Sequence, residues 1–570
     1  MPDVVPDPLR LLGRAAAQLR LDNLPPEVVQ RAKQRVLDTI ACLVAGYDAG
    51  ISDSIRSYVL AQGGNPEATL LPGGQRTTAA LAGFAHAAYI FGLELADAAP
   101  RGTVHPGCEI VSIALALAEK HGLGGAAIIP AVVAGYETEI RFGRTMHPHA
   151  FYRGWSTIGL LGAIGPAVTA GHLLGLDAER LDNAIGISLN LSPVATGRAH
   201  QPKTVKWVIG GHACATGLLA AEMAARGITG LRDPVSDWIA LITEENYPER
   251  LTEGISEAGL FTQWELLSGI VTKYYATVGP LAAPLEAMFK LVAEHDIRAE
   301  DVIEIHADCT RRTAIFNKPC PENEIAARGS LPYCLAVAVC SRDPGQLLAP
   351  AYRPESLRNP AYLAMAARVR ITSNEDYESQ YPARSLARVT VRLRGGLVVS
   401  EEVDRSEIPR YLTPTDADIE DKFRRIATPV LGDQPSRNAA IRYVKNALDK
   451  PWWDSSAAAD IPRRGANGES LEAIIDQLQS QACEARLYDA NFAYDMARDL
   501  ALIDIPTLVI EIATPHEDRR LGRQGEMVRE LIRGSRLHTL QATADSPFNV
   551  EKQSDELAGI IEVFCRSASA

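Results

Sequence analysis

The stretch PEVVQRAKQRVLDTIACLVAGY, residues 26–47, sets the pattern for the first half of the chain. Its apolar residues recur at intervals of three and four and it finishes near a glycine, which is typical of an amphipathic helix. Residues 111–122 (VSIALALAEKHG) and 215–227 (ATGLLAAEMAARG) repeat this pattern. AAIIPAVVAGY, at 126–136, is apolar on every side, and a helix tolerates that only when other helices surround it. The pattern predicts a large, multi-layer helical domain.

The pattern of apolar and polar residues changes after about residue 275. Apolar and polar residues then alternate in three stretches: DVIEIHADC (301–309), ARVRITS (367–373) and SLARVTVRLRGGLVVSEEV (385–403). Such alternation predicts half-buried strands, and Gly395-Gly396 between two such runs predicts a hairpin. Residues 413–432, TPTDADIEDKFRRIATPVLG, begin with a Thr/Asp cap and return to helical spacing. We therefore expect a small α+β domain followed by a return to the helical body.

The predicted fold class is mainly α, in four parts. Residues 1–275 form the first part of the helical domain, 276–410 the α+β domain, 411–453 the return to the helical domain, and 454–570 a linker with a C-terminal α/β segment. SSAAADIPRRGANGES (455–470) is rich in small residues, proline and glycine, as linkers are. DIPTLVIEIATP (504–515) predicts a short apolar strand and DELAGIIEVFCR (555–566) a terminal helix.

The composition is that of a soluble protein with extensive cores. Of 570 residues, 46% are hydrophobic and 22% charged, and the formal net charge is −13. This balance excludes disorder and a multi-span membrane protein, and the acidic surplus disfavours a nucleic-acid partner. Residues 157–176 carry no full charge over about the length of a membrane span, but their glycines and proline favour a buried helix pair. We expect neither a nucleic-acid nor a membrane partner.

The cysteines and the N-terminus indicate the compartment. The nine cysteines are widely spread and include no C-x-x-C pair, which argues for reduced thiols and against a structural zinc site. The N-terminus, MPDVVPDPLR, has acids and prolines where a signal peptide would have a basic and then an apolar run. We expect a cytoplasmic chain. Phosphate-loop, H-E-x-x-H and G-x-S-x-G motifs are absent, so we expect no metal or nucleotide cofactor.

One loop stands out between two apolar helical segments: ELADAAPRGTVHPG, residues 94–107, which carries Glu94, Asp97 and His105. Ionisable groups between buried helices must be paired or functional, because an isolated charge there is costly. A helix-capping loop with a hydrogen-bonded histidine is the alternative interpretation.

Three further stretches carry isolated polar groups. RAHQPKTVKWVIGG (198–211) places Lys203 and Lys206 ahead of an apolar, glycine-rich helix start, which suits a carboxylate, although a solvated loop face is the alternative. GIVTKYYATVGP (269–280) holds Lys273 in an uncharged run; only eleven of the 57 basic residues are lysines. In ARGSLPYCLAVAV (327–339), Tyr333 opens an apolar helix, and a core tyrosine bonded to backbone is the alternative there.

Taken in this order, the four stretches resemble the MmgE/PrpD family over about residues 26–453. The family contains 2-methylcitrate dehydratases, cis-aconitate decarboxylases and iminodisuccinate epimerases. The resemblance implies a large helical domain, a smaller α+β lid, a homodimer, and a site in the cleft between the domains without metal or organic cofactor. The C-terminal segment resembles the last strands and helix of an α/β-hydrolase, with Asp545 or Ser546 in place of the catalytic histidine, so no working triad is expected.

The family's landmarks fall on particular residues of this chain. The positions that match are Glu94, Asp97, His105, Lys206, Lys273 and Tyr333. Within FYRGWSTIG (151–159), Ser156 takes the place of the family's frequent histidine, and Tyr152 and Arg153 lie just before it. Ala96 and Ala98 replace two polar residues of the family's acidic stretch.

The resemblance implies a cofactor-independent lyase, of dehydratase or decarboxylase type, that moves a proton next to a carboxylate or carbonyl of a small organic acid. His105, oriented by Asp97 or Glu94, would transfer the proton. Lys206 and Lys273 would bind a carboxylate or stabilise the enolate, or Lys206 would be the base. Tyr333 and Tyr152 would donate hydrogen bonds or a proton. The remaining substrate-binding candidates are Ser156, Arg153 and Lys203. An isomerase or epimerase of the same fold, or an inactive assembly protein, is the alternative.

Overall fold

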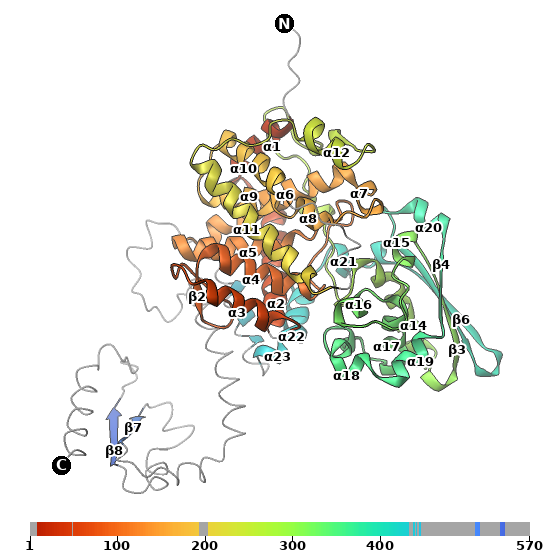
Figure 1. Ribbon diagram of the computed structural model, residues 1–570. Helices are drawn as coiled ribbons and strands as arrows, with labels where there is room; N and C mark the ends of the chain where they lie inside the picture. The colour runs from red at the N-terminus through yellow and green to blue at the C-terminus, as the bar shows by residue number, and fades with distance from the viewer. Residues whose placement is uncertain are drawn as a thin grey trace. The chain divides into compact units, whose positions relative to one another are not determined.

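The computed structural model describes residues 8–47, 49–192 and 203–431, several positions between 437 and 448, and two strands at 508–513 and 536–541. The chain divides into two compact units, Met1–Ala482 and Cys483–Ala570. Within the first unit, coloured red to teal in Figure 1, we call the mainly helical part the helical domain and the part with the four-stranded sheet, residues 282–412, the lid domain.

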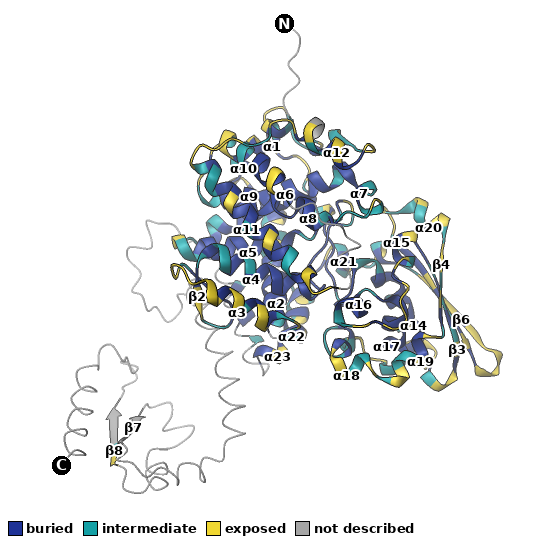
Figure 2. Ribbon diagram, viewed as in Figure 1, coloured by how far each residue is buried: buried dark blue, intermediate teal, exposed yellow. Residues whose placement is uncertain are grey.

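The helical domain is built around α11, which packs against α4, α5, α9 and α10. Its inner helices are buried along most of their length (Figure 2). The domain comprises α1 (Pro8–Ala17), α2 (Pro26–Gly46), α3 (Ser52–Gln62), α4 (Ala79–Gly92), α5 (Pro106–His121), α6 (Gly125–Met146), α7 (His149–Tyr152), α8 (Thr157–Leu161), α9 (Ile164–Leu173), α10 (Ala178–Leu191), α11 (Val205–Ala225), α12 (Ala240–Ile242), α13 (Glu265–Ser268), α22 (Asp416–Ile426) and α23 (Thr428–Leu431), with the short strands β1 (Ala68–Thr69) and β2 (Arg76–Thr77). This confirms the predicted mainly α fold, and α8 with α9 is the buried helix pair expected at 157–176.

Glycines set how closely α4 and α11 approach. A Cβ on Gly92 would lie 2.0 Å from the ring of Trp207, and one on Gly211 would lie 2.5 Å from the carbonyl oxygen of Phe84. No larger residue fits at either place without moving a helix. Because the two helices are held this close, the residue that follows α4 and the first turn of α11 become neighbours.

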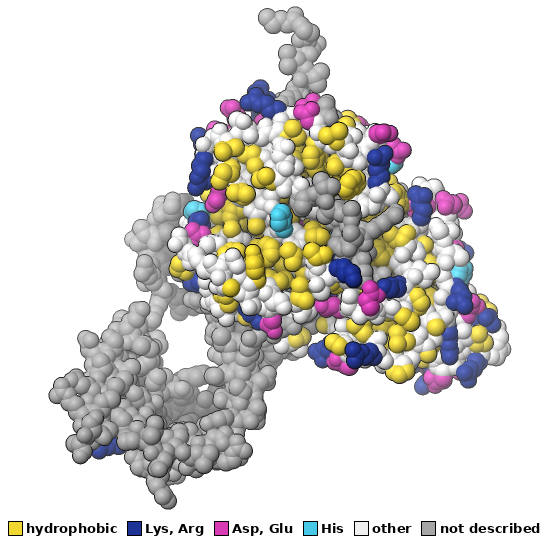
Figure 3. Space-filling model, in the orientation of Figure 1, with side chains coloured by type: hydrophobic (Ala, Val, Ile, Leu, Met, Phe, Trp, Pro, Cys, Tyr) yellow, Lys and Arg dark blue, Asp and Glu magenta, His cyan; other side chains and the backbone are white. Residues whose placement is uncertain are grey.

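α11 is also the one helix of the described residues that is long and apolar enough to cross a membrane by length and composition alone. Its neighbours in the structure are other helices, α4, α9 and α10 among them. That is the environment of a core helix. On the face drawn in Figure 3, hydrophobic side chains cover much of the middle of this domain, and most charged ones lie toward its edges.

The lid domain is a four-stranded sheet, of order β4-β3-β5-β6, packed against helices (Figure 1). β3 pairs with β4 in parallel and with β5 antiparallel, and β5 and β6 form the predicted hairpin, where Gly395 and Gly396 have φ of 83° and 86°. The elements are β3 (Val302–Cys309), β4 (Val369–Ser373), β5 (Leu386–Leu393), β6 (Val398–Asp404), α14 (Ala282–Glu294), α15 (Arg311–Ala314), α16 (Glu324–Arg328), α17 (Leu331–Ser341), α18 (Pro354–Leu357), α19 (Pro360–Ala366), α20 (Glu375–Gln380) and α21 (Pro409–Leu412).

After the lid, the chain returns to the helical domain. α22 starts with a capping box in which Thr415 and Asp418 satisfy each other's backbone amides, and it packs on α2. Lys422 of α22 forms a buried ion pair with Asp38 of α2 at 2.6 Å. Helices α22 and α23 lie within the stretch where helical spacing was expected to return.

In the second unit, β7 (Leu508–Ala513) and β8 (Arg536–Gln541) pair in parallel. β7 confirms the short strand expected within 504–515. Asp545, Ser546 and the expected terminal helix at 555–566 lie outside the described residues.

Candidate active site

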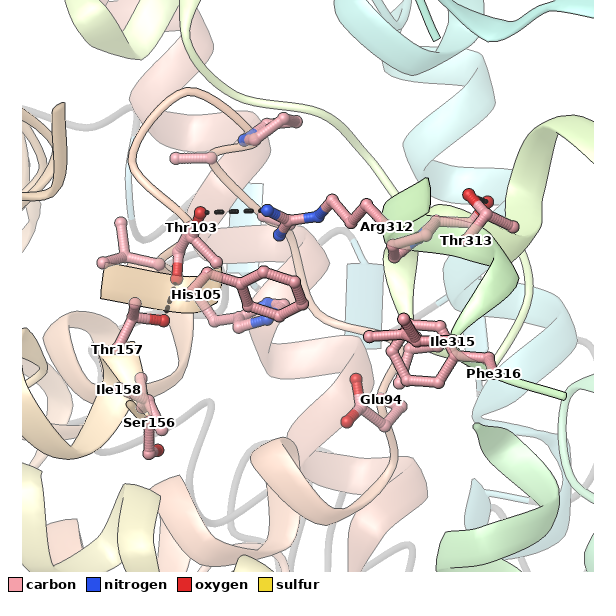
Figure 4. Close-up of a pocket in the computed structure, with 18 of the residues that line it drawn as sticks. Glu94, Thr103, His105, Ser156, Thr157, Ile158, Arg312, Thr313, Ile315 and Phe316 are labelled. Carbon is pink, nitrogen blue, oxygen red and sulfur yellow. Dashed lines mark hydrogen bonds between the residues drawn. The ribbon is translucent and has the colours of Figure 1, made fainter. Parts of the chain in front are cut away.

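A cavity of about 530 Å³ lies between the helical domain and the lid. Its walls come from the loop after α4, the segment 151–158, the first turn of α11 and several lid loops. Among the described residues, its charged lining consists of one carboxylate, Glu94, and three cations, Lys206, Arg312 and Arg405. Figure 4 shows Glu94, His105 and Arg312 on different sides of this space. Among the described residues, no cluster of three or more His, Cys, Asp and Glu side chains could hold a metal ion.

Glu94 binds two lysines at once. One carboxylate oxygen accepts from the Nζ of Lys206, and the other lies 3.1 Å from the Nζ of Lys273. All three side chains are buried. Burial alone would raise the pKa of Glu94, but the positive charges of Lys206 and Lys273 hold it well below its usual range. Burial lowers the pKa of Lys273, and Glu94 opposes that shift. The triad carries one net positive charge.

Local structure explains why these three residues meet. Glu94 lies two residues after the end of α4, and Lys206 lies in the first turn of α11, which the glycines hold against α4. Lys273 is brought in by an isolated antiparallel bridge in which Ala98 and Val271 exchange backbone hydrogen bonds of 3.1 and 2.8 Å. The anion expected at the start of α11 is therefore supplied by the protein itself.

His105 lines the same cavity as a neutral imidazole. Its Nδ1 lies 3.1 Å from the backbone carbonyl oxygen of Asp97. Because a carbonyl can only accept, Nδ1 carries the proton and Nε2 keeps its lone pair. Burial, helped by the nearby charge of Lys273, lowers the pKa of His105 to about 4. His105 can therefore accept a proton at neutral pH.

The side chain of Asp97 does not orient His105 as expected. Its carboxylate accepts from the backbone amide of Gly107 at 3.1 Å and from the hydroxyl of Tyr136 at 2.8 Å. Burial raises the pKa of Asp97. The side chain thus ties the loop to α5 and α6, and only its backbone carbonyl reaches the imidazole. Sequence spacing could not distinguish these two contacts.

Two non-glycine residues of this loop have left-handed backbone conformations: Glu94 with φ of 55° and Thr103 with φ of 56°. Such conformations are costly for residues with a Cβ, most of all for β-branched ones, and cluster at functional sites. The hydroxyl of Thr103 lies 2.7 Å from Nδ1 of His147 and 3.3 Å from Nη1 of Arg312. The strained loop thus links the helical domain to the lid.

The segment 151–158 contributes Tyr152 and Ser156 to the lining. The Tyr152 hydroxyl donates to Glu378 of the lid, and burial together with this bond raises the pKa of Tyr152 to about 12. Ser156 caps α8 by accepting from the amide of Gly159 at 3.3 Å. Arg153 is exposed and does not line the cavity.

Tyr333 and Lys203 also lie away from the cavity. The Tyr333 hydroxyl donates to the carbonyl oxygens of Ala351 at 2.6 Å and Ser356 at 3.1 Å, inside the lid. This is the bonding to backbone that was the alternative interpretation, and a hydroxyl so engaged does not reach a substrate. Lys203 is exposed and is not part of the lining, as a solvated loop face would be.

Two lid residues of the cavity were not predicted from the sequence: Arg312 in α15 and Arg405 just after β6. Both are buried and both line the cavity. Each lies within three residues of the end of a predicted strand. That position is the sequence signal that could have drawn attention to them.

Comparisons with known proteins agree with this architecture. Residues 10–239 match the MmgE/PrpD N-terminal domain, and residues 275–448 match the MmgE/PrpD C-terminal domain. A cis-aconitate decarboxylase of Aspergillus terreus is 25% identical over 457 residues, which cover 76% of this chain and 92% of that protein. A cis-aconitate decarboxylase-like protein of Aspergillus oryzae is 23% identical over 73% of this chain and 90% of its own. The human cis-aconitate decarboxylase is 23% identical over 76% and 90%, respectively.

The two family models cover the helical domain and the lid, and their boundary falls in the segment that precedes the lid helix α14. The cavity lies between the two matched regions, with Glu94, His105 and Lys206 in the first and Arg312 and Arg405 in the second. The chain belongs to the MmgE/PrpD family.

Proposed function

We propose that this chain is a cofactor-independent lyase of the decarboxylase type, acting on a small organic acid. The relatives named above are cis-aconitate decarboxylases or similar to them, which supports this class. The observation that carries the proposal is the joint presence of a neutral histidine and a lysine beside one cavity, His105 and Lys206. A base and a cation within one site are what proton transfer next to a carboxylate requires.

The chemical difficulty is the negative charge that develops beside a carboxylate. When a carboxylate leaves as carbon dioxide, the electron pair of the broken C–C bond stays on the neighbouring carbon, which must then take up a proton. Lys206 binds the oxygens on which that charge spreads, and Nε2 of His105 takes a proton from water and passes it to the carbon that carbon dioxide has left. Glu94 holds Lys206 in position through their buried ion pair.

Deuterium uptake tests this proposal directly. The purified full chain is incubated in heavy water with a panel of small di- and tricarboxylates that includes cis-aconitate, and proton NMR follows the loss of carbon-bound hydrogen while released carbon dioxide is trapped. We expect at least one acid to gain deuterium and to release carbon dioxide. His105→Gln should slow both processes by about 10²-fold or more, the usual contribution of a general acid or base.

The matched control is His212→Gln, which replaces an exposed histidine of α11 and should leave both rates unchanged. Deuterium uptake with loss of water and no carbon dioxide would replace decarboxylation by dehydration. Absence of exchange and of carbon dioxide across the panel would reject the proposal.

A further inference from the structure

Arg312 and Arg405 form an unusual pair on the lid side of the cavity. Their side chains are 7% and 6% exposed, so both charges are largely removed from water. No carboxylate of the described residues lies within 4 Å of either guanidinium, although most buried arginines of this chain have one or donate to several carbonyls. The Nε atoms of both have no hydrogen-bond partner, as is also true of Arg35, Arg141 and Arg328, so the difference lies in the absent carboxylate.

What holds these two side chains is weak. Arg312 donates to Thr103 at 3.3 Å and lies 4.2 Å from the centre of the Phe151 ring and 5.4 Å from that of the Tyr381 ring. Arg405 donates to the carbonyl oxygen of Gly279 at 3.4 Å and lies 5.8 Å from the ring of Tyr411. Burial lowers the pKa of Arg405, and the charge of Arg312 adds to that shift, so the two cations are near enough to repel each other.

Such an arrangement calls for an anion. A buried charge without a partner costs several kcal/mol, whereas a guanidinium with free N–H groups binds a carboxylate through two parallel hydrogen bonds. Among the described lining residues there are three cations and one carboxylate, and that carboxylate, Glu94, is already bound by two lysines. The two arginines have no such partner, so the larger unmet demand for negative charge is on the lid wall.

We propose that Arg312 and Arg405 are specificity-determining residues that bind a second carboxylate of the substrate, at a distance from the carboxylate that Lys206 binds. This rests on the proposed function and adds to it. Because the two arginines belong to the lid and Lys206 to the helical domain, a substrate with two carboxylates bridges the two domains, and one with a single carboxylate does not.

Binding measurements on matched ligand pairs test the proposal without any turnover. Isothermal titration calorimetry gives the Kd of malonate, succinate and glutarate, and of the monoamide of each, for the full chain. The monoamide keeps the shape of the acid but loses one charge. For at least one chain length we expect the diacid to bind about ten-fold more tightly than its monoamide, which corresponds to about 1.4 kcal/mol.

Arg312→Gln or Arg405→Gln should abolish that preference while leaving the Kd of the monoamide within about two-fold. Arg388→Gln is the control, because Arg388 is a half-exposed lid arginine paired with Glu402 and does not line the cavity. Arg312→Lys keeps the charge and loses the two-pronged donor, so it should restore part of the preference and guard against a variant that fails to fold.

Equal binding of diacid and monoamide at every chain length would overturn the proposal, as would a preference that survives both replacements. A preference that depends on the arginines, in a chain that exchanges no deuterium, would support the proposal and reject the lyase alone. The two ideas can therefore fail separately.

Discussion

The two walls of the cavity solve the problem of buried charge in opposite ways. On the helical wall, Lys206 and Lys273 share the carboxylate of Glu94, so each lysine has an acidic partner within the protein. On the lid wall, Arg312 and Arg405 have no acidic partner among the described residues. The cations of the helical wall have an acidic partner before a ligand binds. Those of the lid wall gain one only from the ligand.

This difference separates two tasks. A balanced cluster keeps its geometry without a substrate, which suits groups that must hold a proton-transfer site ready. An unbalanced cluster gains most when an anion arrives, which suits recognition. Variants that change one wall test this difference, because the other wall keeps its charged residues.

The largest effect should come from the proton carrier on the helical wall. His105→Gln removes the Nε2 lone pair and should lower turnover of any accepted acid by about 10² to 10⁴-fold. Binding of that acid should change little, because the charges of both walls remain. Steady-state kinetics compared with calorimetry checks this. A turnover number close to that of the unaltered protein would show that His105 is not the base.

The next largest effect should follow from Glu94→Gln. It leaves two buried lysines without their carboxylate, and removal of one partner of a buried ion pair typically costs about 3 to 5 kcal/mol. We expect a large loss of unfolding free energy in urea. Glu401→Gln is the control, since Glu401 pairs with the half-exposed Lys290 on the lid and its loss should cost under about 1 kcal/mol. Equal losses in the two variants would contradict a balanced helical wall.

Acid should weaken the protein through the helical domain and not through the lid wall. Burial lowers the pKa of both His105 and His86 to about 4, below the value of about 6.5 of an unfolded histidine. At a pH between these two values, the histidine is protonated in the unfolded chain and neutral in the folded chain. The free energy of unfolding therefore falls as the pH falls, by at most about 3 kcal/mol per histidine. His105→Gln should flatten this dependence of the melting temperature, and Arg405→Gln should not. An unchanged slope in His105→Gln would contradict the shift.

The smallest effect separates two buried arginines of the lid. Arg328 donates to the carbonyl oxygens of Leu93 at 2.9 Å and Ala276 at 3.2 Å, so Arg328→Gln should cost about 1 to 3 kcal/mol. Arg312→Gln removes a charge without a carboxylate partner and should change the unfolding free energy by less than about 1 kcal/mol, or raise it. Thermal unfolding without ligand distinguishes them. A loss in Arg312→Gln as large as that in Arg328→Gln would show that the lid wall is balanced after all.

The sequence predicts the secondary structure of this protein better than the arrangement of its candidate active site. Hydrophobic spacing is a local property, so the helices, the four lid strands and the hairpin at Gly395 and Gly396 could all be predicted. Lys206 and Lys273 attracted attention because lysine is scarce in this chain and both lie in apolar surroundings. Their shared partner, Glu94, is distant in sequence and could not be assigned to them.

Arginine gave no comparable signal. Only eleven of the 57 basic residues are lysines, so arginine is common in this chain. What distinguishes Arg312 and Arg405 is that neither forms an ion pair within 4 Å with a described acidic residue, whereas the buried Arg328 does. Tyr333 shows the converse case. Its position in the S-L-P-Y pattern suggested a catalytic hydroxyl, but backbone carbonyls 18 and 23 residues further along occupy that hydroxyl. Neither fact is encoded in local spacing.

The left-handed backbone at Thr103 bears on how this loop would respond to random mutagenesis. Glycine suits a φ of 56° far better than a β-branched residue does, so selection for thermal stability alone should enrich glycine at this position. Selection for activity should keep the threonine, whose hydroxyl joins His147 to Arg312. The two selections would favour different residues at position 103. The difference in thermal stability between the two variants would measure how much stability the protein loses to keep the threonine hydroxyl.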